Sequence, residues 1–594
     1  MWEIRPCLSL LLFISLTLAE FADFGTKPKG ENPTLYNPEN DPIVQLDETT
    51  FNDTIYCVNG TDCTSYMVEF YSDWCGHCRA YAPLYKSLAN DVAKWKNVVR
   101  IGAINCADPL NENTCRANGV MFFPLIKYFS RNSSADIDGQ KLKTYQSVAL
   151  MRDQLTQAVV TENDQHNYPD WPNFQPLKPI ATYSEIFDGV PEKIDKKVLV
   201  FEEDPQSLVG TQLILDLQEY SDKIAVQKCR KGHPLTEALH ISDYPTVAIF
   251  KRGEHEPIMQ AELRRLLFNE IEEYLGKEGH IAGLRFGSHP HNRTAQVASD
   301  SAEKPEEEEQ TNSTVNECER NPDSCKAKYY ASELDMLKAM RYALLREVTR
   351  NGGDISGNKL SALYTFTDAL ANHFPHKTIS QAENGSDVYL DASSRARVVF
   401  THMRDFIKQN GLENPLPADE WKAEFVRAEE DQGKPFPTNS DWQHCKGSSP
   451  QYRGYTCGLW TTFHALTVHN YKNKGSEEGY DPKDILKAIR GWVGSFFGCE
   501  HCRQHFLKMT GKNFKMDDHI HKPEDAFLYL WRAHNIVNAR LKGRDTEDPK
   551  YPKVQFPASF LCPECKVGGD QEKDEETTKQ YLLNYYSNIR PVVD

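Results

Sequence analysis

Three short segments, RGYTCGLWTTFH (453–464), GCEHCRQH (498–505) and WRAHNIVN (531–538), carry the most informative pattern in the chain. In each segment, aromatic, imidazole, amide or thiol side chains recur at helical spacing. At about 3.6 residues per turn, such side chains share one face of a helix. They are Cys457, Trp460, Thr461 and His464; Cys499, Cys502 and His505; and Trp531, His534, Asn535 and Asn538. The sequence therefore predicts three helices with rings and polar edges on one side and a dithiol among them.

Such a set of side chains suits a flat, electron-accepting ring system. Aromatic rings stack on its faces, while imidazoles and amides bond its edge. An adjacent Cys499/Cys502 pair can pass two electrons to a flavin, because a thiolate can attack the flavin ring. For any one of these helices, ordinary core packing is the competing interpretation. Three such faces around one dithiol favour the cofactor interpretation.

The constellation resembles the Erv-like FAD-binding domain of sulfhydryl oxidases. That resemblance implies a four-helix bundle that binds FAD, which we expect to occupy residues 435–570, with a tail at 571–594. Cys445 and Cys457 are expected to form a structural bridge that fixes the first helix of this domain.

The start of the chain and its overall charge bear on its location. An apolar run within residues 1–19, preceded by Arg5, is typical of a cleaved secretory signal and is too short to span a membrane. No later run is long and apolar enough for a transmembrane helix. The 68 basic and 85 acidic residues argue against a nucleic-acid partner. We expect a lumenal protein of the Golgi or endoplasmic reticulum, or a secreted one. Six Asn-x-Ser/Thr sequons agree with that route, at Asn52, Asn59, Asn132, Asn292, Asn312 and Asn384.

Cysteine usage points the same way. Removal of the signal, which contains Cys7, leaves fifteen of the sixteen cysteines. In an oxidising compartment, close pairs of cysteines indicate disulfides, although spacing alone does not prove the pairing. Seven local pairs can be drawn: Cys57/Cys63, Cys75/Cys78, Cys106/Cys115, Cys318/Cys325, Cys445/Cys457, Cys499/Cys502 and Cys562/Cys565. Cys229 remains, and we expect it to be a small buried residue, with an intermolecular bridge as the alternative.

Residues 35–160 contain a short apolar strand (67–71), then Trp74-Cys75-Gly76-His77-Cys78, a helix, and a later strand that begins near Phe123-Pro124. This order resembles a thioredoxin domain of the protein disulfide isomerase kind. Cys75 would lie at a helix N-terminus, which favours its thiolate, and His77 can add positive character nearby. The resemblance implies a cis bond before Pro124. A purely structural Cys75/Cys78 disulfide is the alternative, whereas Cys106/Cys115 is expected to be structural.

The middle of the chain is less informative. Residues 175–280 repeat the strand and the Tyr244-Pro245 feature without a dithiol, and so predict a redox-inactive thioredoxin-like domain. Residues 286–317 are expected to be an acidic linker, and 325–430 a helical scaffold region without a catalytic cluster. The expected fold class is thus two α/β thioredoxin-like domains, an all-α region and an Erv-like four-helix bundle.

Over nearly its whole length this order resembles the quiescin sulfhydryl oxidase family. Carried over position by position, the resemblance implies cofactor contacts at Arg453, Trp460, His464, His505, Trp531, His534, Asn535, Asn538 and Lys553. We include His501, which stands in the dithiol loop where vertebrate members often have an acidic residue. Phe556 stands where a Trp is common. Cys562/Cys565 is expected to be a structural staple; a redox-active pair or half of a zinc site with Cys499/Cys502 are the alternatives.

The implied chemistry is a relay that oxidises thiols. Reduced secretory proteins or small dithiols would reduce the Cys75–Cys78 disulfide, which would then reduce Cys499–Cys502, then FAD, then oxygen to hydrogen peroxide. Family analogy makes Cys75 the outer sulfur and Cys502 the one that faces the flavin; the residues alone leave this second assignment open. Two other classes remain: a flavin-free disulfide isomerase, and a non-enzymatic secreted scaffold in which all pairs are structural.

Overall fold

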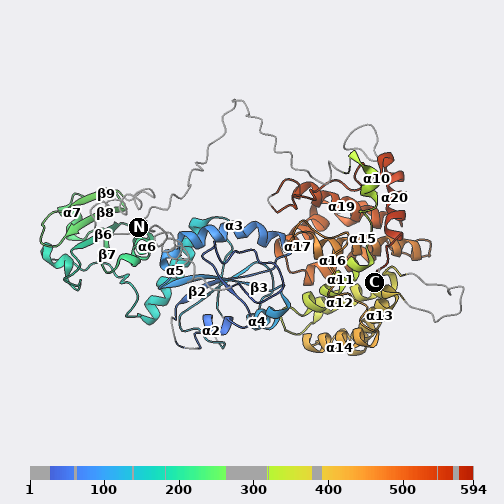
Figure 1. Ribbon diagram of the computed structural model, residues 1–594, viewed down its shortest axis with the longest axis horizontal. Helices are drawn as coiled ribbons and strands as arrows, with labels where there is room; N and C mark the ends of the chain where they lie inside the picture. The colour runs from blue at the N-terminus through green and yellow to red at the C-terminus, as the bar shows by residue number, and fades with distance from the viewer. Residues whose placement is uncertain are drawn as a thin grey trace, which may run out of the picture.

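The computed structural model describes residues 27–262, 318–376, 391–565 and 574–592, apart from 59, 61–62, 137–138, 181, 319 and 545. The predicted signal (1–19), the acidic linker (286–317), the last part of the second predicted domain (263–280) and the sequons at Asn59, Asn292, Asn312 and Asn384 lie outside these residues. Figure 1 shows two sheets side by side, followed by an all-helical region. The expected order of two α/β units and an all-α part is confirmed.

The first sheet has the strand order β1-β3-β2-β4-β5. Its strands are β1 (Val44–Leu46), β2 (Ser65–Tyr71), β3 (Val99–Asn105), β4 (Leu125–Phe129) and β5 (Gln140–Leu142). β1, β3 and β2 run parallel, and β4 and β5 are antiparallel to their neighbours. Helices α2 (Phe51–Ile55), α3 (Gly76–Asp91), α4 (Glu112–Ala117) and α5 (Val148–His166) surround it. Every residue of β2 is buried, as expected for a central strand covered on both faces.

The second sheet has the order β7-β6-β8-β9. Its strands are β6 (Lys196–Glu202), β7 (Ile224–Arg230), β8 (Thr246–Lys251) and β9 (Met259–Glu262), with helices α6 (Val209–Asp216) and α7 (Pro234–Ala238). Cys229 is fully buried in β7, as predicted. Arg152 of α5 links the two sheets by ion pairs to Asp91 at 2.8 Å and to Asp216 at 2.5 Å.

The helical scaffold region begins with α10 (Pro322–Lys326) and α11 (Glu333–Arg341). α11 runs on into a π-helical turn, η6 (Tyr342–Glu347). Helices α12 (Gly357–His373), α13 (Ala392–Asn410) and α14 (Ala418–Asp431) follow. Wide π turns are rare and occur frequently at functional sites. The residues of η6 contact the first sheet's domain, as described below.

The last helices are α15 (Gly454–Lys474), α16 (Lys483–Phe496), α17 (Glu500–Lys508), the π turn η7 (Met509–Asn513), α18 (Met516–His519), α19 (Asp525–Leu541) and α20 (Glu575–Ser587). α15 contacts α11, α12, α16, α19 and α20. The segment predicted as a tail (571–594) therefore includes a helix of this bundle. Thr578, Leu582 and Tyr586 are buried on one face of α20, which explains why it packs there.

Among the described residues, the structure contains six disulfides: Cys57–Cys63, Cys106–Cys115, Cys318–Cys325, Cys445–Cys457, Cys499–Cys502 and Cys562–Cys565. Cys318–Cys325 is buried in a small apolar cluster with Phe560 and Leu561, and Cys562–Cys565, which follows these two residues in the chain, is buried as well. This placement supports the staple interpretation of Cys562/Cys565. Of the helices that the structure describes, none has the length and apolar character needed to cross a bilayer.

Candidate active site

The dithiol Cys75/Cys78 lies at the start of α3, with Cys75 as the N-cap residue. Both thiols are reduced and buried. Burial alone would raise the pKa of Cys75. Hydrogen bonds from the Cys78 thiol and from the backbone N–H groups of Cys78 and His77, together with the Arg79 charge, lower the pKa below its usual value. Burial and the thiol–thiol contact raise the pKa of Cys78 well above its usual value. Cys75 is thus the better nucleophile of the two.

A buried carboxyl, Glu69, lies on β2 near this dithiol. Its side chain is fully buried and accepts a hydrogen bond from the Tyr36 hydroxyl. Burial raises the pKa of Glu69 to about 8, and the Glu69 charge contributes to the raised pKa of Cys78. Glu69 was not predicted from the sequence. The signal was present, because an acidic residue stands in the middle of the apolar strand Met67-Val-Glu-Phe-Tyr71.

His77 does not supply the positive charge that we predicted. Its ring stacks on the ring of His501, with centroids 4.4 Å apart and planes 11° apart. Burial, and then the charges of His501 and His505, lower the pKa of His77 to about 4. The imidazole is therefore neutral near pH 7. The prediction was wrong because it took no account of the burial of His77 or of its contact with His501.

The second dithiol, Cys499–Cys502, opens α17, again with the first cysteine as N-cap. Cys499 is fully buried, whereas Cys502 is partly exposed. The backbone of Phe123, next to cis-Pro124, forms hydrogen bonds with the residues on both sides of Cys499. Phe123 N–H donates to Gly498 O at 2.9 Å, and Glu500 N–H donates to Phe123 O at 3.4 Å. The residue before the cis-proline of the first domain thus pairs like a strand with the residues on either side of Cys499.

Trp74, beside Cys75, anchors this contact. Its indole N–H donates to the Tyr342 hydroxyl at 2.9 Å. Its ring stacks on Phe497 at 5.5 Å and meets Tyr455 edge-on at 4.9 Å. Trp74 is only 8% exposed in this arrangement. A buried Trp with a satisfied N–H is the kind of residue that dominates interface energies.

The aromatic and imidazole residues of α15 and α19 come together as the helical spacing predicted. Trp460 and His534 stack with centroids 4.0 Å apart and planes 7° apart. His464 Nε2 lies 3.0 Å from His534 Nδ1. Burial lowers the pKa of His464 to about 3 and that of His534 well below its usual value, so both rings are neutral. Tyr586 of α20 stacks on His464 at 4.9 Å, a contribution that we missed because 571–594 was predicted to be a tail.

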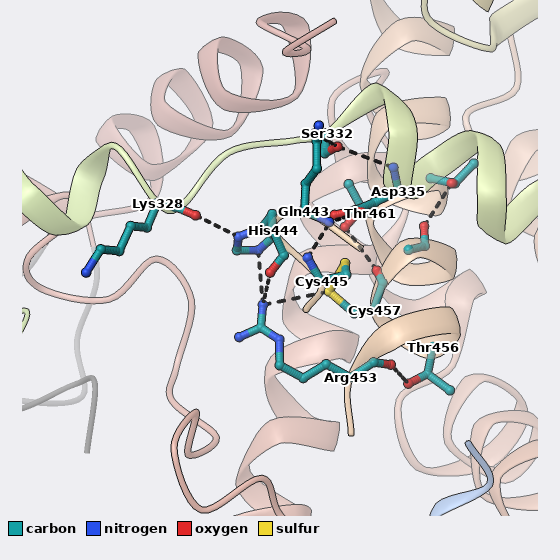
Figure 2. The surroundings of a disulfide bond; sticks show 12 residues. Lys328, Ser332, Asp335, Gln443, His444, Cys445, Arg453, Thr456, Cys457 and Thr461 are labelled. Carbon is teal, nitrogen blue, oxygen red and sulfur yellow. Dashed lines mark hydrogen bonds between the residues drawn. A yellow bond between two sulfur atoms is a disulfide. The ribbon is translucent and has the colours of Figure 1, made fainter. Parts of the chain in front are cut away.

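Arg453 is the N-cap of α15 and lies just outside the helix in which we had placed it. Its backbone has φ 61°, a left-handed conformation that costs energy for a residue with a side chain. Figure 2 shows its guanidinium turned toward His444 and the Cys445–Cys457 disulfide. Arg453 Nη2 donates to His444 O at 2.7 Å. Asp335 holds the same loop by accepting the backbone N–H of Cys445 at 2.7 Å.

Arg453 and Lys553 test whether this region suits a phosphate-containing cofactor. The Arg453 guanidinium lies 4.5 Å from the centre of the Tyr551 ring. Burial, and then the Arg453 charge, lower the pKa of Lys553 to about 8, although Glu547 and Asp548 oppose the shift. Within the described ranges, neither cation forms an ion pair with a carboxylate. Partly buried cations that lack a direct counter-charge fit the anionic phosphates of a dinucleotide.

The other predicted cofactor contacts divide into two groups. The Trp531 indole and the Asn535 amide donate to Phe556 O at 2.6 and 2.8 Å, and Phe556 N–H donates to Asn535 Oδ1 at 2.8 Å. In this structure these polar groups hold the 556 loop, and Asn538 is buried on the same helix. His501 and His505 instead line an open cavity of about 580 Å³ with Arg490, Lys508 and Lys512. His501 thus lies at the contact between the two dithiol domains, outside the Trp460–His534 stack.

The helical scaffold region also contributes to the contact between the dithiols, which we did not predict. Tyr342 binds Trp74. Arg346 forms an ion pair with Glu112 and donates to Asp108 O at 3.2 Å. Arg350 donates to Met121 O at 3.1 Å. No local pattern in the sequence shows which domain such residues will face.

Comparison with known proteins agrees with this architecture. Residues 42–152 match a family model described as thioredoxin, and residues 457–557 match one described as the Erv1 / Alr family. Sulfhydryl oxidase 1 of Gallus gallus is 30% identical over 568 residues, covering 94% of this chain and 68% of that protein. Sulfhydryl oxidase 2 of Homo sapiens is 27% identical over 562 residues, covering 93% and 73%. A solved sulfhydryl oxidase fragment of human QSOX1 is 31% identical, covers 44% of this chain and 98% of that fragment, and has a TM-score of 0.38.

These relatives match nearly the whole chain, including both dithiol segments and the region between them. The homology supports a thiol oxidase that acts on thiols with oxygen. From its two matched domains and its full-length relatives, the chain belongs to the quiescin sulfhydryl oxidase family.

Proposed function

We propose that this protein is a FAD-dependent thiol oxidase that forms disulfides in reduced secretory proteins and small dithiols. Electrons would pass from Cys75/Cys78 to Cys499/Cys502, then to FAD and to molecular oxygen, with release of hydrogen peroxide. The proposal extends the thiol oxidase activity of the family to named residues and to an order of transfer. It also places the protein in the lumen of the Golgi or endoplasmic reticulum, or outside the cell.

One observation carries the proposal: a reduced dithiol and an oxidised one are held together by the backbone of Phe123 on both sides of Cys499. In this arrangement the Cys75 thiolate attacks Cys499 Sγ, and Cys502 leaves as a thiolate. The Cys78 thiol then loses its proton, attacks Cys75 and releases Cys499. The first pair ends oxidised and the second reduced, so the electron count balances.

Glu69 is suited to the proton transfer in the second step. Its pKa of about 8 allows it to exist in both protonation states near neutral pH. Cys78 is the thiol whose pKa must be overcome, because burial keeps it protonated. We therefore assign Glu69 as the acceptor of the Cys78 proton, directly or through water.

The same reasoning gives roles within the second pair. Phe123 pairs with the residues that flank Cys499, which supports Cys499 as the sulfur attacked by the first domain. Cys502 lies one helical turn further along α17, next to Phe506, whose ring is 6.1 Å from Trp460. This placement supports Cys502 as the sulfur that faces the cofactor.

The cofactor would be held by Trp460, His464, His505 and His534 around its rings and by Arg453 and Lys553 at its phosphates. A bound FAD would supply a two-electron acceptor for the reduced Cys499/Cys502 pair and an electron donor to oxygen. The neutral His464 and His534 rings bind by stacking and hydrogen bonding without adding charge. Asn535 and Trp531 are assigned to support of the 556 loop.

The flavin-free disulfide isomerase is the competing function. It would use Cys75, Cys78 and the cis-proline loop alone, and it gives no reason for the docking of that loop around Cys499. An absorption spectrum of the purified protein separates the two functions. We expect a flavin spectrum that bleaches with dithiothreitol under nitrogen and returns on aeration with formation of peroxide. Colourless, folded protein that still isomerises disulfides would overturn the proposal.

A further inference from the structure

Arg350 occupies the junction of three parts of the chain. It follows α11 and the π turn η6, at the end of the first long helical stretch of the scaffold region. Its Nη2 donates to Phe496 O at 2.8 Å, at the C-terminal end of α16, from which a short loop leads to Cys499. The same nitrogen donates to Met121 O at 3.1 Å, in the loop that leads to cis-Pro124. The guanidinium lies 5.5 Å from the centre of the Phe123 ring.

Glu347, one helical turn earlier, fixes the direction of this guanidinium. Arg350 Nη1 forms an ion pair with Glu347, whose side chain is 1% exposed. Burial raises the pKa of Glu347, while Arg350 and the backbone N–H of Gly498 stabilise its charged form. An Arg fork held by a buried carboxylate is pre-organised, so it loses little entropy when it binds further acceptors.

Gly498 leaves room for this arrangement. A Cβ added at Gly498 would lie 2.5 Å from Arg350 Nη1 and 3.0 Å from Phe123 Cε2. The residue before Cys499 therefore has space only for a hydrogen while Arg350 and Phe123 are both in place. The Arg350 guanidinium forms part of the surface against which Phe123 packs.

We propose that Arg350, oriented by Glu347, is a positioning residue for dithiol exchange between Cys75 and Cys499. Its bonds to Glu347 and Phe496 lie within the C-terminal half and prepare the Cys499 loop. Its bond to Met121 forms only when the thioredoxin domain docks, and it fixes the cis-proline loop against that loop. The inference rests on the proposed relay and adds a residue from the scaffold region, which contains none of the reacting sulfurs.

The test measures the exchange itself. In a full-length, FAD-loaded Cys78→Ser variant, the Cys75 thiolate attacks Cys499 Sγ and releases the Cys502 thiolate, so a Cys75–Cys499 disulfide accumulates. N-ethylmaleimide stops the reaction by alkylating Cys502, and peptide mass spectrometry measures the product. We expect Arg350→Met to lower the rate of its formation by about tenfold or more, since hydrogen bonds from a charged group are lost. Arg350→Lys keeps the charge but lacks the planar fork, and should fall in between.

Two controls separate positioning from stability. Arg341→Met removes an arginine that pairs with Glu429 inside the same scaffold region, and should leave the exchange rate unchanged. In a Cys75→Ser/Cys78→Ser background, dithiothreitol must reduce Cys499–Cys502 directly, and Arg350→Met should leave that rate unchanged. The inference is overturned if Arg350→Met exchanges as fast as its parent, or if the direct route slows equally. Absence of the Cys75–Cys499 disulfide in the parent Cys78→Ser protein would instead refute the relay.

Discussion

The rings of His77 and His501 stack face to face, with centroids 4.4 Å apart, across the contact between the two dithiol domains. His505 meets His501 edge-on at 4.4 Å. The charges of Arg540 and Lys508 also act on this cluster. The cluster thus contains three imidazoles with two cations nearby, and Glu500 begins α17, the helix that carries His501 and His505. Protonation of two of these rings would therefore place like charges in contact, and protonation of His501 or His505 would add a charge near Arg540.

Docking of the two domains should weaken in acid. The pKa of His77 is about 4 when docked, below the ordinary histidine value of about 6.5. Above pH ~6.5, His77 is neutral in both the docked and the undocked protein, and docking is strongest. Between pH ~6.5 and ~4 the undocked state takes up a proton that the docked state excludes, so docking weakens by up to about tenfold per pH unit. Energy transfer between dyes on the two halves, in a Cys75→Ser/Cys78→Ser background, would measure this.

His501→Phe is the matched variant for this effect. It keeps a ring to stack on His77 but removes one titrating group and its charge. We expect its docking to depend less steeply on pH. An identical pH profile in both proteins would show that the His77–His501 contact does not control docking.

Glu69→Gln should make the thioredoxin domain more stable and should slow its dithiol exchange. The pKa of Glu69 is raised by burial to about 8 in the folded protein, so folding stability falls as pH rises from ~4.5 toward 8. Removing the carboxyl should raise the free energy of unfolding by roughly 3 kcal/mol at pH 7 and should abolish that pH dependence. Denaturant unfolding at pH 5 and pH 7.5 checks this.

Release of Cys499 by Cys78 should slow in Glu69→Gln, because the proton acceptor is lost. Unchanged rates would assign Glu69 a structural role only.

The sequence predicted features that depend on local spacing. Trp460 and His464 share a face of α15, and Cys75 and Cys499 each begin a helix, because helical periodicity and motif position are local properties. Asn535 was correctly placed on the inner face of α19, but its amide is used by the backbone of Phe556. Spacing predicts which face a side chain occupies and does not predict what satisfies its hydrogen bonds.

Features that depend on contacts between distant segments were missed. The pKa of His77 is set by burial and by His501, more than four hundred residues away in the chain. Trp74 is likewise buried by residues that are distant in the chain, namely Tyr342, Tyr455 and Phe497. The helix α20 lies in the segment that was predicted to be a tail, yet Thr578, Leu582 and Tyr586 on one of its faces are buried. Burial of this kind follows from docking geometry, which no local pattern records.

Lys553→Met should weaken retention of FAD. The ammonium is buried beside Arg453, and its pKa is lowered to about 8, a cost that an anionic phosphate would offset. We expect at least about a tenfold weaker affinity, since a charge-assisted bond is lost. The ratio of flavin to protein absorbance after dialysis measures retention. Lys542→Met, which changes an exposed lysine at the end of α19, is the control and should retain FAD normally. Equal retention in both variants would remove Lys553 from the cofactor site.

Tyr586→Ala tests whether α20 belongs to the flavin-binding bundle. Tyr586 is 6% exposed, stacks on His464 at 4.9 Å and approaches Phe556 at 6.3 Å. Its truncation should lower the free energy of unfolding by about 3 kcal/mol, as for other large buried aromatic side chains. It should also loosen His464, and with it the Trp460–His534 stack, so FAD retention should fall as well. Thermal unfolding and the flavin absorbance report the two effects separately. Gln580→Ala changes an exposed residue of α20, and should leave both nearly unchanged. If Tyr586→Ala behaves like that control, α20 is a tail in function as well as in sequence position.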